Sequence, residues 1–133
     1  MTVRVKICGV TRVDDAIASV EAGADLIGLN FFAASPRYLS IEGARVVREA
    51  IGRRIKVVGV FVNASRDYVD ERLRALGLDL LQFSGDEDDA ILAGWPAAGA
   101  AAVSEMRIGS RVRARTAAMV GPNRGANFQD ALR

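Results

Sequence analysis

The chain has 133 residues, of which 50% are hydrophobic and 26% are charged. This length fits one domain and excludes a complete eight-stranded parallel barrel, which takes about 250 residues and rarely fewer than about 200. The composition is typical of a soluble globular protein and excludes disorder over most of the chain.

The formal net charge of +2 is distributed unevenly along the chain. Residues 1–99 carry 12 basic and 14 acidic side chains, whereas residues 100–133 carry 6 basic and 2 acidic ones. A basic tail can bind nucleic acid or an anionic membrane, but this one has few aromatic residues and no lysine, so a solvated segment is the favoured interpretation. We therefore expect neither partner. The tail includes Arg107, Arg111, Arg113, Arg115 and Arg124.

A single cysteine and the absence of histidine exclude an intramolecular disulfide and argue against a structural zinc site. The N-terminus lacks the basic region and apolar run of a signal peptide, and no stretch of about 18 apolar residues can form a membrane helix. We expect a cytoplasmic protein without a metal.

The first strand and helix are predicted from Val3 to Gly23. Val3 to Cys8 is rich in β-branched residues, which is typical of a strand buried on both faces. Thr11 is expected to cap the helix, with Asp14 in the position of a capping-box acid, and Gly23 to end it. The apolar side chains at helical spacing are Val13, Ile17, Val20 and Ala24.

The second unit has the same order. Asp25 to Phe32 predicts a strand, and Pro36 in the following segment 33–39 excludes a central strand there. Ser40 is expected to open an amphipathic helix that covers the sheet and ends at Gly52. The apolar stripe of this helix is Ile41, Ala44, Val47 and Ile51.

The third unit begins with a strand from Ile55 to Val62. Asn63 and Ser65 lead into a helix that Gly77 ends, and Leu78 to Phe83 predicts a fourth strand. The apolar positions of the helix are Val69, Leu73 and Leu76.

Four acidic residues follow Gly85 and resemble a metal cluster, but they also suit the positive end of a fourth helix, so we favour an electrostatic role. Beyond them the pattern loosens. Val103 to Ile108 is a candidate fifth strand, Arg111 to Val120 a candidate basic helix, and residues 121–127 a loop.

Strands and helices repeat about every 25 residues, and such connections give parallel strands with right-handed crossovers. The expected fold is α/β with about four to five parallel βα units, either part of a barrel or a small doubly wound sheet. We divide the chain into residues 1–99, with this repeat, and a basic tail at residues 100–133.

In parallel α/β folds the ligand site lies beyond the carboxyl ends of the strands. The candidates there are Cys8, Asn30, Asn63, Ser84 and, in a loop, Arg37. Gly9 would allow a substrate to approach the backbone closely. A lone cysteine in a strand is usually a small buried hydrophobe, and Arg37 is either a carboxylate or phosphate ligand or a solvated loop residue.

Without histidine, proton transfer would fall to a thiolate or a carboxylate. A thiolate at Cys8 needs nearby positive charge, and the candidate sources are Arg37 and, more weakly, Lys6.

Several blocks of sequence occur in a specific order and spacing: KICGVT at 6–11, DA at 15–16, EAGAD at 21–25, SPRYLS at 35–40 and VGVFVN at 58–63. Over residues 3 to about 92 the chain thereby resembles the first part of the phosphoribosylanthranilate isomerase family. The resemblance implies a partial (β/α)8 barrel. It also implies an Amadori rearrangement of N-(5′-phosphoribosyl)anthranilate in tryptophan biosynthesis, with this phosphoribosyl compound as substrate and no cofactor.

The resemblance also implies roles for individual residues. Cys8 matches the general base that removes the proton from C2′ of the ring-opened Schiff base, and Arg37 matches the arginine that holds the anthranilate carboxylate. Gln82 and Ser84 fall in the family's Gln-Leu-His-Gly segment and are candidate substrate-binding residues. Ser84 replaces an active-site histidine, which weakens a polar contact.

After residue 100 the sequence departs from the family. We find no aspartate at the end of a sixth strand to act as general acid and no glycine-rich phosphate segment, which suggests a truncation, a frameshifted tail or an internal deletion. We therefore expect little or no isomerase activity from this chain. The alternative is a non-catalytic half-barrel that self-associates through its open sheet edges.

Overall fold

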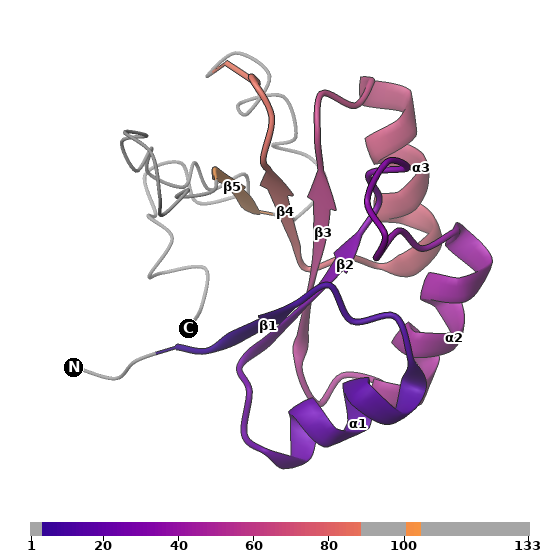
Figure 1. Cartoon of the computed structure of the whole chain (residues 1–133), viewed down its shortest axis with the longest axis vertical. Helices are drawn as coiled ribbons and strands as arrows, with labels where there is room; N and C mark the ends of the chain where they lie inside the picture. The colour runs from indigo at the N-terminus through magenta and orange to yellow at the C-terminus, as the bar shows by residue number, and fades with distance from the viewer. Residues whose placement is uncertain (1–3, 89–100, 105–133) are drawn as a thin grey trace.

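Strands and helices alternate along the chain, as the apolar pattern predicts. The computed structural model, shown in Figure 1, describes residues 4–88 and 101–104. Within them the order is β1 (Lys6–Cys8), α1 (Val13–Glu21), β2 (Leu26–Asn30), α2 (Ile41–Ile51), β3 (Lys56–Phe61), α3 (Arg66–Leu76), β4 (Leu80–Phe83) and β5 (Ala101–Ser104).

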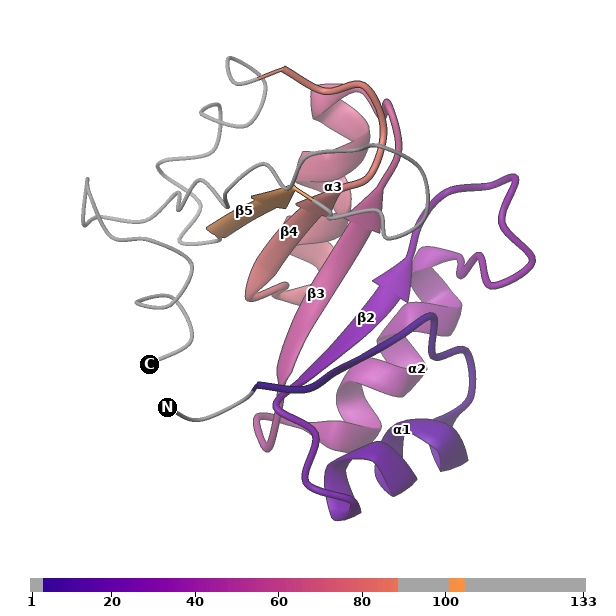
Figure 2. The ribbon, with the colours of Figure 1, turned by 60° about the vertical axis from the view of Figure 1, so that its left-hand side comes forward.

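The strands form one parallel sheet whose order, β1-β2-β3-β4-β5, follows the chain. Figure 1 and Figure 2 show α1, α2 and α3 on the same side of this sheet. A doubly wound sheet reverses its strand order and carries helices on both faces, whereas a barrel adds strands in sequence and keeps its helices outside. The arrangement therefore confirms part of a barrel.

The main hydrophobic core lies between the sheet and the helices. Side chains alternate between the two faces of a strand, so Ile27 and Leu29 of β2 point to the helices and are fully buried. The register of the strand pairs places Cys8, Asn30 and Gln82 on the opposite face. The helices contribute Ala16, Ala44, Val47, Ile51, Val69, Leu73 and Leu76 to the core.

The predicted ends of α2 and α3 are confirmed. The Ser40 hydroxyl accepts a hydrogen bond from the backbone N–H of Gly43 at 3.1 Å, and Ser65 caps α3 through the N–H of Tyr68 at 3.2 Å. Each bond satisfies an amide that has no partner in the first turn of its helix. Gly77 ends α3 with a left-handed φ of 58°.

Two predictions for the first unit are wrong. Helix α1 has Arg12, not Thr11, at its N-cap, and no side chain bonds there. Strand β1 is not buried on both faces, because Val5 is 46% exposed and Ile7 41%, and Cys8 is also exposed. The reason is the position of β1 at the end of the strand order, where β2 is its one partner among the described strands.

The last part of the predicted pattern is tested only partly. Strand β5 lies at Ala101–Ser104, two residues before the predicted start at Val103. Its parallel pairing with β4 includes Ala101 and Ala102, and the sequence pattern did not include them because alanine has a low strand propensity. Residues 85–88 are not helical. The rest of the fourth helix, the basic helix, the loop at 121–127 and the division at residue 99 lie outside the described residues and stay predictions.

None of the helices in the described part of the chain is long and apolar enough to cross a membrane.

Candidate functional site

The side chain of Cys8 lies at the carboxyl end of β1, against the backbone of β2. A Cβ placed on Gly28 would lie 2.9 Å from the Cys8 Sγ, so the thiol occupies the space that this glycine leaves open. The turn after Cys8 is tied to the same strand, because the N–H of Gly9 donates to the carbonyl of Gly28 at 2.9 Å. The thiol is exposed and therefore accessible to a ligand.

Arg37 packs against the residue that follows Cys8. A Cβ placed on Gly9 would lie 2.5 Å from the Arg37 Cδ and 2.9 Å from its Nη1. Gly9 also has a φ of 77°, which side chains rarely adopt. The sequence predicted that Gly9 leaves room for a substrate, but in the structure Arg37 fills that room. The thiol and the guanidinium group are thereby brought to the same corner of the sheet.

The loop that carries Arg37 is held by hydrogen bonds between residues that are close in sequence. The Arg37 N–H donates to the Ser35 hydroxyl at 3.2 Å. At the base of the loop, Leu39 N–H donates to the Asn30 carbonyl at 2.9 Å, and the Asn30 side chain accepts from the Phe32 N–H at 2.8 Å. Asn30, a candidate for ligand binding, thus shapes the loop.

The predicted substrate-binding residues Gln82 and Ser84 lie at the end of β4 and contact each other. The Gln82 Nε2 donates to the Ser84 hydroxyl at 3.3 Å, and the Lys6 ammonium donates to the Gln82 Oε1. Gln82 is only 3% exposed. The sequence indicated Lys6 as a positive charge near Cys8 but gave no sign of this contact. The contact joins β1 to β4.

The loops after β3 and β4 are joined by polar contacts. Asn63 has a φ of 47°, and its side chain accepts a hydrogen bond from the Asp86 N–H at 2.8 Å. The Glu87 carboxylate accepts from the N–H of Asn63 at 2.6 Å and of Gly85 at 2.7 Å. Asn63 and Glu87 therefore have structural roles. Among the described residues no group of three or more His, Cys, Asp and Glu side chains can hold a metal ion.

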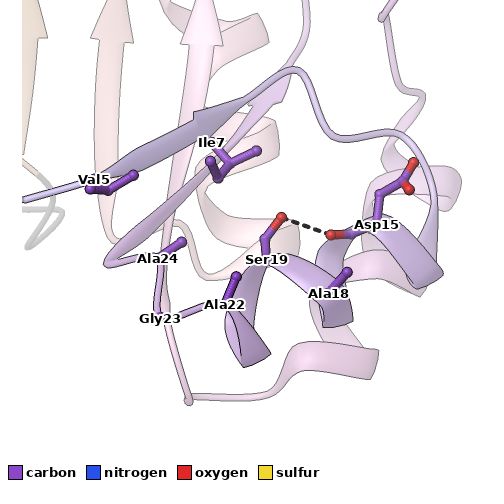
Figure 3. A pocket seen from close by; sticks show the side chains of 8 residues that line it. All are labelled: Val5, Ile7, Asp15, Ala18, Ser19, Ala22, Gly23 and Ala24. Carbon is purple, nitrogen blue, oxygen red and sulfur yellow. Dashed lines mark hydrogen bonds between the residues drawn. The ribbon is translucent and has the colours of Figure 1, made fainter.

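A separate groove of about 400 Å³ lies between β1 and α1. Figure 3 shows Val5 and Ile7 on one of its walls and Ala18 and Ser19 of the helix on the other. The Ser19 hydroxyl donates to the Asp15 carbonyl at 2.7 Å. Because Val5 and Ile7 alternate with Lys6 and Cys8 along the strand, the groove lies on the face away from the thiol.

Comparisons with known proteins agree on one family. The family model described as N-(5′-phosphoribosyl)anthranilate (PRA) isomerase matches residues 5–106. The N-(5′-phosphoribosyl)anthranilate isomerase of Pseudomonas fluorescens (strain Pf0-1) is 54% identical over 93 residues, which are 70% of this chain and 46% of the relative. That of Thiobacillus denitrificans is 50% identical over 90 residues, 68% of this chain and 44% of the relative. The chain thus spans about half the length of the curated relatives it matches.

Solved structures give the same result. Phosphoribosyl anthranilate isomerase from Thermotoga maritima matches with a TM-score of 0.71 and 36% identity, over 77% of this chain and 50% of that one. Another match, also with a TM-score of 0.71 and 36% identity, is an isomerase in complex with reduced 1-(o-carboxyphenylamino)-1-deoxyribulose 5-phosphate; it covers 77% of this chain and 53% of that one.

Proposed function

The chain belongs to the PRA isomerase family, and on this basis we propose that it takes part in the isomerisation of N-(5′-phosphoribosyl)anthranilate. The proposed reaction is an intramolecular aldose-to-ketose conversion that belongs to tryptophan biosynthesis. The observation that carries the proposal is the packing of Arg37 on Gly9, the residue that follows Cys8. In this proposal the corner offers one bound molecule both a basic sulfur, from Cys8, and a guanidinium group that binds its carboxylate, from Arg37.

The proposed base is the Cys8 thiolate. In the ring-opened Schiff base protonated on nitrogen, the thiolate takes the proton from C2′ and becomes a thiol, the electrons of that C–H bond form a C1′–C2′ double bond, and the nitrogen becomes a neutral amine. The thiol proton then returns to C1′, and the C2′ hydroxyl loses its proton to solvent as it becomes a carbonyl. The step requires an accessible sulfur at the reacting carbon, and the exposed thiol at the end of β1 meets this requirement.

The proposed carboxylate ligand is Arg37. Its planar guanidinium group can donate two parallel hydrogen bonds to a carboxylate. A carboxyl group bound there would place the attached aromatic amine next to Cys8. The ligand in the solved isomerase complex contains a carboxyphenylamino group, which has the chemistry that this arrangement would recognise.

Ser84 is proposed to contact the sugar portion of the substrate, and Gln82 is proposed to support this contact. Ser84 is partly exposed and its hydroxyl can donate as well as accept. Gln82 is buried and engaged by Lys6, so it acts mainly by holding the Ser84 hydroxyl.

A pair of alkylating reagents tests the proposed site without requiring turnover. The reagents are 2-(iodoacetamido)benzoate, which carries the anthranilate carboxylate, and iodoacetanilide, which lacks it. In each case the Cys8 sulfur forms a bond to the methylene carbon and iodide leaves. Cys8 is the chain's single cysteine, so the rate of modification measured by mass spectrometry reports on this site alone.

We expect the carboxylate reagent to react about 10- to 100-fold faster relative to its neutral analogue, because hydrogen bonds to charged groups contribute about 1.5–3 kcal/mol. Arg37→Gln should remove this preference while leaving the rate of iodoacetanilide nearly unchanged. Equal preference in the unmodified chain and in Arg37→Gln would refute the assignment of Arg37.

A second candidate function is a non-catalytic half-barrel that pairs with a second copy. The exposure of Val5 and Ile7, at 46% and 41%, favours it, since both line the groove beside β1. One of the solved relatives is described as monomers of a dimeric isomerase. Size-exclusion chromatography with light scattering should then give a dimer, whereas a cooperatively folded monomer would contradict this candidate.

A further inference from the structure

The hydroxyl of Tyr68 connects helix α3 to the loop that carries Arg37. It donates a hydrogen bond of 2.7 Å to the backbone carbonyl of Phe31, the first residue after β2. The other end of the loop is also fixed near β2, because Asn30 forms an isolated parallel bridge with Tyr38. Tyr68 therefore contacts the backbone at the point where the loop leaves the sheet.

The Tyr68 ring is itself held from two sides. Phe61 packs edge-on against it with ring centroids 6.3 Å apart, and the Arg72 guanidinium carbon lies 3.3 Å from the centroid of the ring. An edge-on contact between two aromatic rings is favourable, and so is a guanidinium group placed over the face of a ring. The position of the hydroxyl is consequently determined by packing within the core.

Arg72 is buried to an unusual extent for a charged residue, with 7% of its surface exposed. Its Nη1 donates to the Tyr68 carbonyl at 3.1 Å and to the Glu71 carboxylate at 3.2 Å. Its Nε has no hydrogen-bond partner among the residues that the structure describes. A buried cation that is incompletely paired is unfavourable, so its placement over the Tyr68 ring calls for a role beyond packing.

Tyr68 also interacts with the residue next to Arg37. Burial raises the pKa of Tyr68 above its ordinary value of 10.0, the charge of Arg72 opposes this increase, and the neighbouring Tyr38 adds to it. The hydroxyl stays protonated at neutral pH and remains able to donate. Its hydrogen bond at Phe31 therefore holds the start of the loop.

We propose that Tyr68, clamped by Arg72, is a positioning residue that sets the location of the Arg37 guanidinium group over Gly9 and beside Cys8. This inference rests on the proposed role of Arg37 as a carboxylate ligand. The hydroxyl holds the start of the loop at Phe31, so its loss lets the loop shift without removing Arg37. Carboxylate recognition then weakens while the reactivity of Cys8 itself is preserved.

The test is Tyr68→Phe in the full chain, with Cys8 modified by 2-(iodoacetamido)benzoate and by iodoacetanilide. We expect the ratio of the two rates to fall about threefold or more, with the iodoacetanilide rate unchanged. Val57→Ala is the matched control: Val57 is fully buried near the start of β3, so its truncation destabilises the core away from the loop and should leave the ratio unaltered. A ratio that falls equally in both variants would contradict the proposal.

The double variant Tyr68→Phe with Arg37→Gln separates this inference from the proposed function. If Tyr68 acts through Arg37, the hydroxyl has no further effect on the ratio once Arg37 is replaced. A ratio that Arg37→Gln lowers and Tyr68→Phe leaves unchanged would overturn the positioning role alone. A ratio that Arg37→Gln does not lower would overturn the proposed function, and this inference with it.

Discussion

Gly28→Ala tests the close packing of Cys8 on β2. The added Cβ would lie 2.9 Å from the Cys8 Sγ and 3.3 Å from its Cα, so the thiol must move by several tenths of an ångström. Gly28 is buried within a strand, and its φ is not among the positive values, so alanine introduces a steric conflict without backbone strain. Overpacking of this kind costs about 1–3 kcal/mol, and we expect a loss of stability in that range.

Urea unfolding of Gly28→Ala, Cys8→Ala and the double variant measures this conflict directly. Cys8→Ala removes the sulfur that meets the new methyl group but leaves the tight contact to the Cα, so the double variant should recover part of the loss. A coupling energy of about 1 kcal/mol is expected, since contacting residues are not additive. Strictly additive effects of the two substitutions would refute the packing of the thiol on Gly28.

The remaining predictions concern the first strand. The N–H of Val5 and, less strongly, the side chain of Arg4 hold the pKa of Asp25 below its ordinary value of 3.8, and burial opposes them with a smaller effect than the Val5 bond. The ionised carboxylate therefore stabilises the folded state above that value, and this stabilisation is lost as the pH falls through the lower pKa of the folded state. Asp25→Asn should therefore be less stable than the unmodified chain at pH 7 in thermal unfolding, by a difference that shrinks below about pH 4; a difference independent of pH would argue against the role of the carboxylate. If the chain pairs through β1, light scattering should show that Ile7→Glu is a monomer. Val46→Glu, at a 58% exposed site on α2, should stay paired. The same response from both variants would exclude this surface.

Local patterns in the sequence were sufficient for the elements that a covered sheet requires. The stripe of Ala44, Val47 and Ile51 predicted the buried face of α2, since each lies at helical spacing and is buried. Ser40 predicted its start because a serine hydroxyl satisfies the first free amides. Thr11 failed as a cap because α1 begins one residue later than the pattern indicates.

The site was predictable only in outline. Parallel strands bring their carboxyl ends to one edge, so Cys8 and Ser84 were expected there. The contact of Arg37 with Gly9 depends on the path of a loop, and the contact of Lys6 with Gln82 joins residues 76 positions apart. Neither contact follows from a local pattern in the sequence.

We propose that the corner formed by Cys8 and Arg37 binds the anthranilate end of a phosphoribosyl substrate. The most direct measurement is calorimetric titration with reduced 1-(o-carboxyphenylamino)-1-deoxyribulose 5-phosphate, combined with its protection of Cys8 against iodoacetamide. We predict binding that protects Cys8 and weakens at least tenfold in Arg37→Gln. Absence of protection, or equal affinity of the two proteins, would contradict the claim.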